Sequence, residues 1–274
     1  MNFSHPPGDP VARALMSDTE ELSRGRVRVV SLDTDVVDHA SAVERVARLV
    51  RDAAGGYVCF STVHMVMEAK DSADFADRVN AADMVVPDGM PIVWMQKMQD
   101  QPAAARVRAN DLMMLLCEYA EKNDLTVGFY GGQQMVIDAI RERAGRDYPR
   151  LRVVYAYSPP FRPLTPDEDD AVVLEINAKA PDILFMGLGC PKQENWMAEH
   201  KSKLKAVMLG VGASFDFFAG NVKESPAWMG RIGLEWLYRL FQEPRRLWRR
   251  YLILNPRFMW NAMRQLLSST RAGK

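Results

Sequence analysis

The sequence predicts an α/β fold: a Rossmann-like, mostly parallel sheet with helices on both faces, followed by a C-terminal helical, basic appendage. Short, continuously apolar runs rich in β-branched residues recur along the chain, and segments with helical periodicity separate them. Strands that are apolar throughout are typical of parallel sheets buried on both faces. The 274 residues are 48% hydrophobic and 26% charged, which is ordinary for a soluble globular enzyme and excludes a disordered chain, collagen or a disulfide-stapled miniprotein.

The elements follow in order along the chain. Residues 1–26 are rich in Pro, Gly, Ser and charge, and we expect them to form a flexible leader. A strand is predicted at 27–32, then a helix with a capping box at Ser41–Glu44 and an end at Gly55-Gly56. Further strands are predicted at 57–61, 83–87, 125–130, 151–157, 182–188 and 205–211. The intervening helices are predicted at 64–80, 90–100, 110–123, 133–145, 167–180 and 194–203. This alternation indicates a catalytic domain over 27–225.

The C-terminal segment, residues 226–274, has a different composition and no strand pattern. It contains Trp228, Trp236, Trp248 and Trp260. Pro244 and Pro256 are each expected to end one helix and begin the next. Ten Lys and Arg against two Glu give residues 231–274 a charge of +8, so residues 1–230 carry −8 and the total is zero.

Basic and aromatic residues at helical spacing are typical of an interfacial surface, so we expect this appendage to contact an anionic membrane. Two alternatives are a helical cap packed on the core and a subunit interface in a homo-oligomer. No apolar run approaches the roughly 20 residues of a membrane span, so the contact would be peripheral. The N-terminus has no signal-peptide pattern, and the three scattered cysteines are expected to be reduced, which places the protein in the cytoplasm. Neither these cysteines nor the four histidines have metal-ligand spacing, so we expect no metal site.

Ligands of such sheets bind beyond the carboxyl ends of the strands, so the strand-to-helix turns are the candidate sites. Asp88, in Pro87-Asp88-Gly89, follows the strand at 83–87 and could act as a general base. An equally weighted alternative is that Asp88 caps the helix that begins near Met90.

Two glycine turns could contact a nucleotide. Gly131-Gly132-Gln133 could hold a phosphate at a helix start, although a simple tight turn is the stronger interpretation. The sequence GLGCPKQE at 187–194 gathers glycines, a proline, a cation and an amide at another helix start, with a solvated glycine turn as the alternative. Neither turn matches GxGxxG or GxxxxGK[ST], which disfavours NAD and Walker-type ATP binding.

Four motifs together resemble the WecG/TagA/CpsF family of bacterial glycosyltransferases. They are PDG at 87–89, GLGCPKQE at 187–194, GVGASFDFFAG at 210–220 and GLEWLYRLFQEPRR at 233–246, and the likeness runs from about residue 27 to about 260. The resemblance implies inverting transfer of a sugar from a UDP-sugar to a polyprenyl-diphosphate-linked sugar at the cytoplasmic membrane face. The products would be teichoic acid linkage units, enterobacterial common antigen or exopolysaccharide. N-acetylmannosamine is the best-known donor sugar of the family, with glucose and N-acetylmannosaminuronic acid as alternatives.

The resemblance also implies roles for residues. The general base falls on Asp88, and the appendage, which helps to close the site, would stabilise the diphosphate through Arg239, Arg245 and Arg246. The predicted donor site comprises Thr62, Asn110, Asp111, Gly131, Gly132, Gln133, Gly189, Pro191, Lys192, Gln193 and Glu194.

The chain departs from the family pattern at two places. Phe60-Ser61-Thr62 replaces a Thr-x-Asn segment, so that Ser61 or Thr62 would supply the hydroxyl. Ala109 stands where an Arg-x-x-Gly-x-Asp pattern has glycine, with Asn110 and Asp111 following as expected.

The expected mechanism is direct displacement at the anomeric carbon, with Asp88 taking the proton of the acceptor hydroxyl. Arginines and backbone N–H groups, rather than a metal or other cofactor, are expected to stabilise the departing UDP. Two other classes are weaker interpretations. A nucleotide-binding oxidoreductase lacks its fingerprint, and a nucleic-acid-binding protein would have a body of charge −8 that repels the phosphate backbone.

Overall fold

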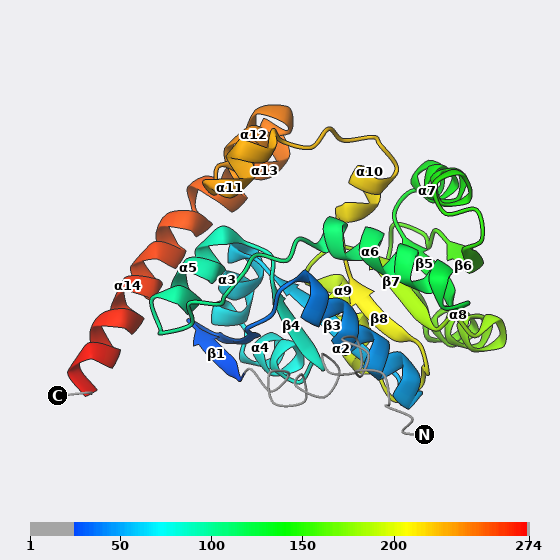
Figure 1. Cartoon of the computed structure of the whole chain (residues 1–274), viewed down its shortest axis with the longest axis horizontal. Coiled ribbons are helices and arrows are strands. Elements are labelled where there is room, and N and C mark those ends of the chain that lie inside the picture. The colour runs from blue at the N-terminus through cyan, green and yellow to red at the C-terminus, as the bar shows by residue number, and fades with distance from the viewer. Residues whose placement is uncertain (1–24, 273–274) are drawn as a thin grey trace, which may run out of the picture.

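The computed structural model describes residues 25–272, without the side chains of residues 227, 231 and 269–272. The leader predicted for 1–26 therefore lies outside the described residues, apart from its last two positions. The described chain forms an α/β sandwich built on one central sheet, with a group of C-terminal helices at one end (Figure 1).

The central sheet has six strands, all parallel, in the order β4-β3-β8-β7-β5-β6. Their bounds are β3 Gly56–Ser61, β4 Met84–Pro87, β5 Thr126–Gly131, β6 Arg152–Tyr157, β7 Ile183–Gly187 and β8 Val207–Gly210. These are the six strands predicted from residue 57 onward. Four of them, β3, β4, β5 and β8, are buried along their whole length, which is why the sequence shows continuous apolar runs rather than alternation.

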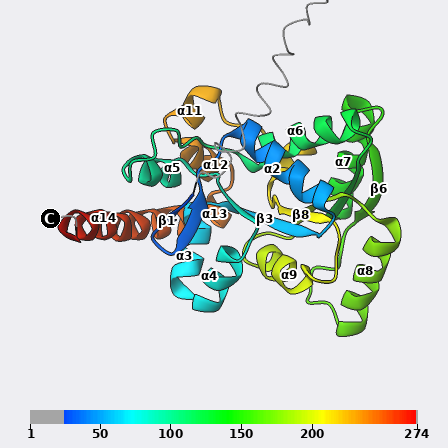
Figure 2. The ribbon, with the colours of Figure 1, turned by 60° about the horizontal axis from the view of Figure 1, so that its bottom comes forward.

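Helices cover both faces of this sheet (Figure 2). One face carries α2 (His39–Asp52), α6 (Ala109–Lys122), α7 (Gln134–Asp147) and α10 (Ser214–Phe218), which enclose one hydrophobic core. The other carries α3 (Val63–Asp71), α4 (Ala73–Asn80), α8 (Pro166–Lys179) and α9 (Lys192–His200), around a second core. Helix α5 (Met90–Lys97) lies beside β4. The predicted Rossmann-like class is confirmed.

The first predicted strand was expected to belong to the main sheet, and that prediction is wrong. Residues 27–32 do not join the main sheet but form part of an antiparallel hairpin, β1 (Arg26–Val29) and β2 (Leu32–Asp35). The chain reverses at Val30, whose φ of 56° lies in the left-handed region. Asp35 fixes the hairpin to the sheet, because its carboxylate accepts from the backbone N–H of Val85 and pairs with Arg45 at 2.8 Å.

Three helix boundaries also differ from the prediction. Helix α2 begins one turn earlier than the predicted capping box, because Asp38 is its N-cap and Ser41 completes the box. It ends at Ala53 in the left-handed conformation, before Gly55-Gly56. The helix predicted at 64–80 is divided into α3 and α4, since the Ser72 side chain caps the second helix.

The C-terminal segment is helical, as predicted. It comprises α11 (Ala227–Arg231), α12 (Glu235–Gln242), α13 (Pro244–Leu252) and α14 (Leu254–Ala272). Pro244 begins α13 and Pro256 lies in the first turn of α14. Helix α14 packs along α3, with Phe258 buried in the core and Arg257 paired with Asp71. The segment is therefore anchored to the α/β body through its last helix, while α12 and α13 lie over one end of the sheet (Figure 1).

Candidate active site

A cavity of about 1050 Å³ opens at the carboxyl ends of four neighbouring strands, β4, β3, β8 and β7. Thr62 and Asp88 contribute to it from the turns after β3 and β4, and Gly189 from the turn after β7. Its opposite wall consists of residues of α12 and α13, among them Arg239 and Arg250. The cavity thus lies where ligands of parallel sheets bind, and the C-terminal helices enclose it.

Backbone hydrogen bonds hold the ends of β3 and β4 together. The carbonyl of Ser61 accepts from the N–H groups of both Asp88 and Gly89, at 3.0 and 3.2 Å. Thr62 is the N-cap of α3, accepting from the Met65 N–H, and its side chain lines the cavity. The Ser61 hydroxyl is fully buried and is not part of the cavity wall. Of the two candidate hydroxyls, Thr62 is therefore the one at the cavity.

Asp88 does not cap α5, so the capping alternative is wrong. The N-cap of that helix is Gly89, with no side-chain cap. The Asp88 carboxylate instead lies in the cavity, 3.7 Å from Nη2 of Arg106, whose Nε donates to the Asp88 carbonyl. Burial raises the pKa of Asp88; Arg106 opposes this shift and Glu235 adds to it.

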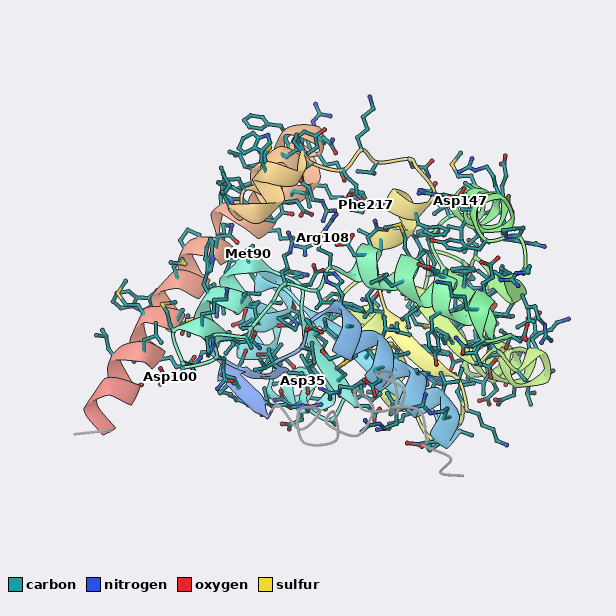
Figure 3. The ribbon with its side chains drawn as sticks, in the orientation of Figure 1. Asp35, Met90, Asp100, Arg108, Asp147 and Phe217 are labelled. Atoms are coloured by element: carbon teal, nitrogen blue, oxygen red, sulfur yellow. The ribbon has the colours of Figure 1, made fainter. Side chains whose placement is uncertain are left out.

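Beside Asp88 lies a cluster of two arginines and two glutamates that sequence reasoning missed. Glu235 approaches Arg106 at 2.9 Å and Arg108 at 3.7 Å, and Glu224 approaches Arg108 at 3.1 Å. The Asn110 amide donates to Glu224 at 2.6 Å. Figure 3 shows Arg108 beneath the C-terminal helices. The Arg-x-x-Gly-x-Asp pattern could have pointed to Arg106, but the sequence shows nothing of its glutamate partner 129 positions away.

Asn110 and Asp111, two residues of the predicted donor site, line different cavities. Asn110 lines the main cavity, and its Oδ1 has no hydrogen-bond partner among the described residues. Asp111 lines instead an adjoining cavity of about 380 Å³, together with Glu224 and Glu235. Ala109, where the family pattern has glycine, is the first residue of α6 and lines the main cavity.

The arginines of α12 and α13 differ in their surroundings. Arg239 lines the cavity, 5.2 Å from the Phe217 ring, and its buried Nε has no partner among residues 25–272. Arg246 lines the cavity and pairs with Glu243 at 2.7 Å. Arg245 is exposed and outside the cavity, so its predicted role at the diphosphate is not supported. Arg250, which the sequence did not single out, lines the cavity, and burial lowers its pKa.

His64 is a further cavity residue that was not predicted. Burial and the nearby Arg250 lower its pKa to about 4, so the imidazole is neutral at pH 7. Within the part of the chain that the structure describes, no three His, Cys, Asp or Glu side chains are grouped as ligands of one metal ion.

In the turn after β7, Gln193 has a structural role. Its amide donates to the Gly210 carbonyl and to Glu194, both at 2.7 Å, and accepts from the Gly189 N–H. Glu194 is fully buried beside it, and burial raises its pKa to about 7. Gly189, Gln193 and Glu194 line the cavity, whereas Pro191 and the exposed Lys192 do not.

The turn after β5 lies outside the cavity. None of Gly131, Gly132 and Gln133 lines it. The Gly132 N–H donates to the carbonyl of Gly187, and a Cβ on Gly131 would lie only 2.6 Å from that residue's carbonyl carbon. The glycines are explained by the close approach of β5 and β7, which favours the tight-turn alternative over a phosphate site.

Comparison with known proteins agrees with this architecture. A model of the glycosyl transferase WecG/TagA/CpsF family matches residues 27–272. The chain belongs to this family. It is therefore a glycosyltransferase, which decides against an oxidoreductase or a nucleic-acid-binding protein. The match extends the resemblance, predicted to about residue 260, through helix α14.

Curated relatives cover most of the chain. An N-acetylglucosaminyldiphosphoundecaprenol N-acetyl-beta-D-mannosaminyltransferase of Bacillus spizizenii is 32% identical over 218 residues, which are 79% of this chain and 82% of the relative. A protein of the same name from Bacillus subtilis is 31% identical over 70% of this chain and 73% of its own length. One from Staphylococcus aureus strain MW2 is 27% identical over 85% and 91%.

The C-terminal helices of this WecG/TagA/CpsF protein also present apolar side chains to solvent. These exposed residues are Trp228, Ile232, Phe241, Trp248, Leu252, Ile253, Met259, Trp260, Met263 and Leu267. Exposed Arg245 and Arg264 lie on the same helices. Among residues 25–272, none of the helices is apolar over the length that crossing a bilayer requires.

Proposed function

We propose that this glycosyltransferase moves an N-acetylmannosamine-type sugar from a UDP-sugar to a polyprenyl-diphosphate-linked saccharide, with inversion, during synthesis of a cell-surface polysaccharide or teichoic acid linkage unit. The names of its relatives support this acceptor and this sugar. The observation that carries the proposal is a carboxylate, Asp88, that shares one large cavity with arginines lacking a carboxylate partner. UDP-glucose is the alternative donor, because Thr62 stands just after β3 at the position where the family pattern Thr-x-Asn has asparagine.

In the proposed reaction, the acceptor hydroxyl attacks the anomeric carbon from the face opposite UDP. The new glycosidic C–O bond forms as the bond between the anomeric carbon and the phosphate oxygen breaks, and the hydroxyl proton passes to Asp88. Such assistance is worth about 10²–10⁴-fold in rate. The raised pKa of Asp88 suits this role, because a more basic carboxylate accepts the proton more readily.

UDP departs with additional negative charge on its diphosphate. Arg239 and Arg250 lie in the cavity without a carboxylate partner among the described residues, and we assign them to this diphosphate. Arg246, which also lines the cavity, would assist if Glu243 released it. No cofactor takes part in the proposed reaction.

The acceptor is a lipid, so the enzyme must reach a membrane surface. Exposed aromatic residues such as Trp248 and Trp260, with Arg245 and Arg264 on the same helices, suit the interface of an anionic bilayer. We therefore propose that the enzyme is a peripheral protein on the inner face of the cytoplasmic membrane.

The Asp88→Asn variant tests the proposed function. Turnover should fall by at least about 100-fold, because the amide cannot accept the proton, while the affinity for UDP changes little. A UDP-release assay with a panel of UDP-sugars and a short-chain lipid-diphosphate acceptor measures the first quantity, and calorimetry measures the second. Asp216→Asn is the matched control, since Asp216 is another cavity carboxylate whose pKa burial raises. Equal losses in both variants, or wild-type turnover in Asp88→Asn, would refute the assignment.

A further inference from the structure

Glu235 is the first residue of α12, and its carboxylate lies against the α/β body. Its side chain is 16% exposed, and one oxygen, Oε2, approaches both Arg106 and Arg108. These arginines precede α6, more than 120 positions earlier in the chain. Glu235 therefore joins the C-terminal helices to the segment beside Asp88.

Arg106 is shared between two carboxylates. Its Nη2 is 2.9 Å from Glu235 and 3.7 Å from Asp88. Its Nε donates to the backbone carbonyl of Asp88, not to the carboxylate. The two nitrogens on this edge of the guanidinium, Nε and Nη2, are thus each held by a group other than the Asp88 carboxylate, so that carboxylate has no close ion pair with Arg106.

We propose that Glu235 is a positioning residue for the general base: it holds the Arg106 guanidinium away from the Asp88 carboxylate and fixes α12, with Arg239, over the cavity. The inference rests on the proposed function of Asp88. A base in a tight bidentate pair with arginine would be weaker, because the cation stabilises its charged form. Glu235 supplies the competing carboxylate that prevents this pairing.

Charged groups from three segments face Asp88. Arg106 and Arg108 precede α6, Glu235 and Arg239 lie on α12, and Arg250 lies on α13. The four arginines favour the ionised form of Asp88, whereas Glu235 raises its pKa. Removing the charge of Glu235 therefore lowers the pKa of Asp88, both directly and by releasing Arg106. The base would remain ionised to lower pH but would be less able to accept a proton.

The test compares Glu235→Gln with Glu224→Gln across the pH range. Both glutamates pair with arginines that precede α6, but Glu224 lies before α11, contacts Arg108 and Asn110, and forms no ion pair with Arg106 among the described residues. In Glu235→Gln, we expect kcat to fall roughly tenfold, part of the ~10²–10⁴-fold that a general base supplies. The acidic limb of its kcat profile should move to lower pH. In Glu224→Gln, the acidic limb should stay at its wild-type position.

Thermal melting of both variants shows whether either loss reflects unfolding. An unmoved acidic limb in Glu235→Gln, or the same movement in both variants, would overturn the inference and leave Glu235 as a structural contact. Failure of the proposed function is a separate result: it would appear as full turnover of Asp88→Asn.

Discussion

At the scale of single residues, the arginines of the cavity differ in whether they contact a carboxylate. Arg106 and Arg108 contact carboxylates across the two parts of the chain, and Arg246 contacts Glu243. Arg249 lines the cavity without such a partner but is exposed, whereas Arg239 and Arg250 have no such partner among the residues that the structure describes and are half-buried. A guanidinium drawn from water without a counter-ion is unfavourable, and an anionic ligand relieves that cost. These two side chains are therefore the strongest candidates to bind the diphosphate.

Arg250→Gln should weaken binding of UDP by about 10- to 100-fold, since a hydrogen bond to a charged group contributes about 1.5–3 kcal/mol. The unliganded variant should melt at the wild-type temperature or above, because an unpaired charge has been removed. Calorimetry and thermal melting measure the two effects, with Lys192→Gln, an exposed cation outside the cavity, as control. Unchanged UDP affinity would contradict this role, and so would turnover that EDTA abolishes and Mg²⁺ restores.

The sequence located part of this site. Asp88 and Thr62 could be predicted because residues just after a parallel strand must lie at its carboxyl end. Arg250 and Glu235 could not, because the direction of a side chain on a helix depends on how that helix docks. That Gly131 and Lys192 lie outside the cavity could not be predicted for a related reason: a glycine turn or a cation at a helix start looks the same whether it faces a ligand, a neighbouring strand or solvent.

At the scale of elements, the six strands of the central sheet were predicted within one or two residues, while the first strand was assigned to the wrong sheet. An apolar run carries the signal of burial but not the identity of its partner strand. Helix α14 illustrates the same limit. Its aromatic and basic composition suggested a surface, yet Phe258 is 1% exposed and packs in the core against α3.

Phe258→Ala should therefore reduce the free energy of unfolding by about 3–5 kcal/mol, as expected for a buried phenylalanine. Leu267→Ala, at an exposed position of the same helix, should change it by less than about 0.5 kcal/mol. Urea denaturation followed by circular dichroism measures both. Similar small effects would mean that α14 is attached only loosely to the body.

At the scale of the whole molecule, the zero net charge is a cancellation between a body of −8 and a C-terminal segment of +8. The fold brings that segment back over the body, where Glu224 and Glu235 neutralise part of the arginine charge beside Asp88. Because Phe258 anchors the segment, ending the chain near residue 225 would uncover the core, so substitutions on the full chain test the membrane contact more cleanly.

In a flotation assay with anionic vesicles, the double variant Arg245→Gln/Arg264→Gln should partition into the vesicle fraction roughly 30-fold less, from about 1 kcal/mol per arginine. The matched control is Arg48→Gln/Arg51→Gln, which removes two exposed arginines at the end of α2. Raising the salt concentration should reduce the difference, because it screens surface charge. Equal flotation of the two double variants would exclude an electrostatic contribution from the C-terminal helices.

Helix α13 has consequences for how such an enzyme can evolve. Arg246, Leu247 and Arg250 line the cavity, whereas Arg245, Trp248 and Leu252 are exposed outside it, three and then four positions apart. Adaptation to a different lipid would change the exposed residues of α13 and leave the cavity-lining residues unchanged. Insertion or deletion of a single residue would rotate the rest of the helix by about 100° and disturb the cavity-lining and the exposed residues together. We therefore expect natural variants of this helix to differ by substitution and to keep its length.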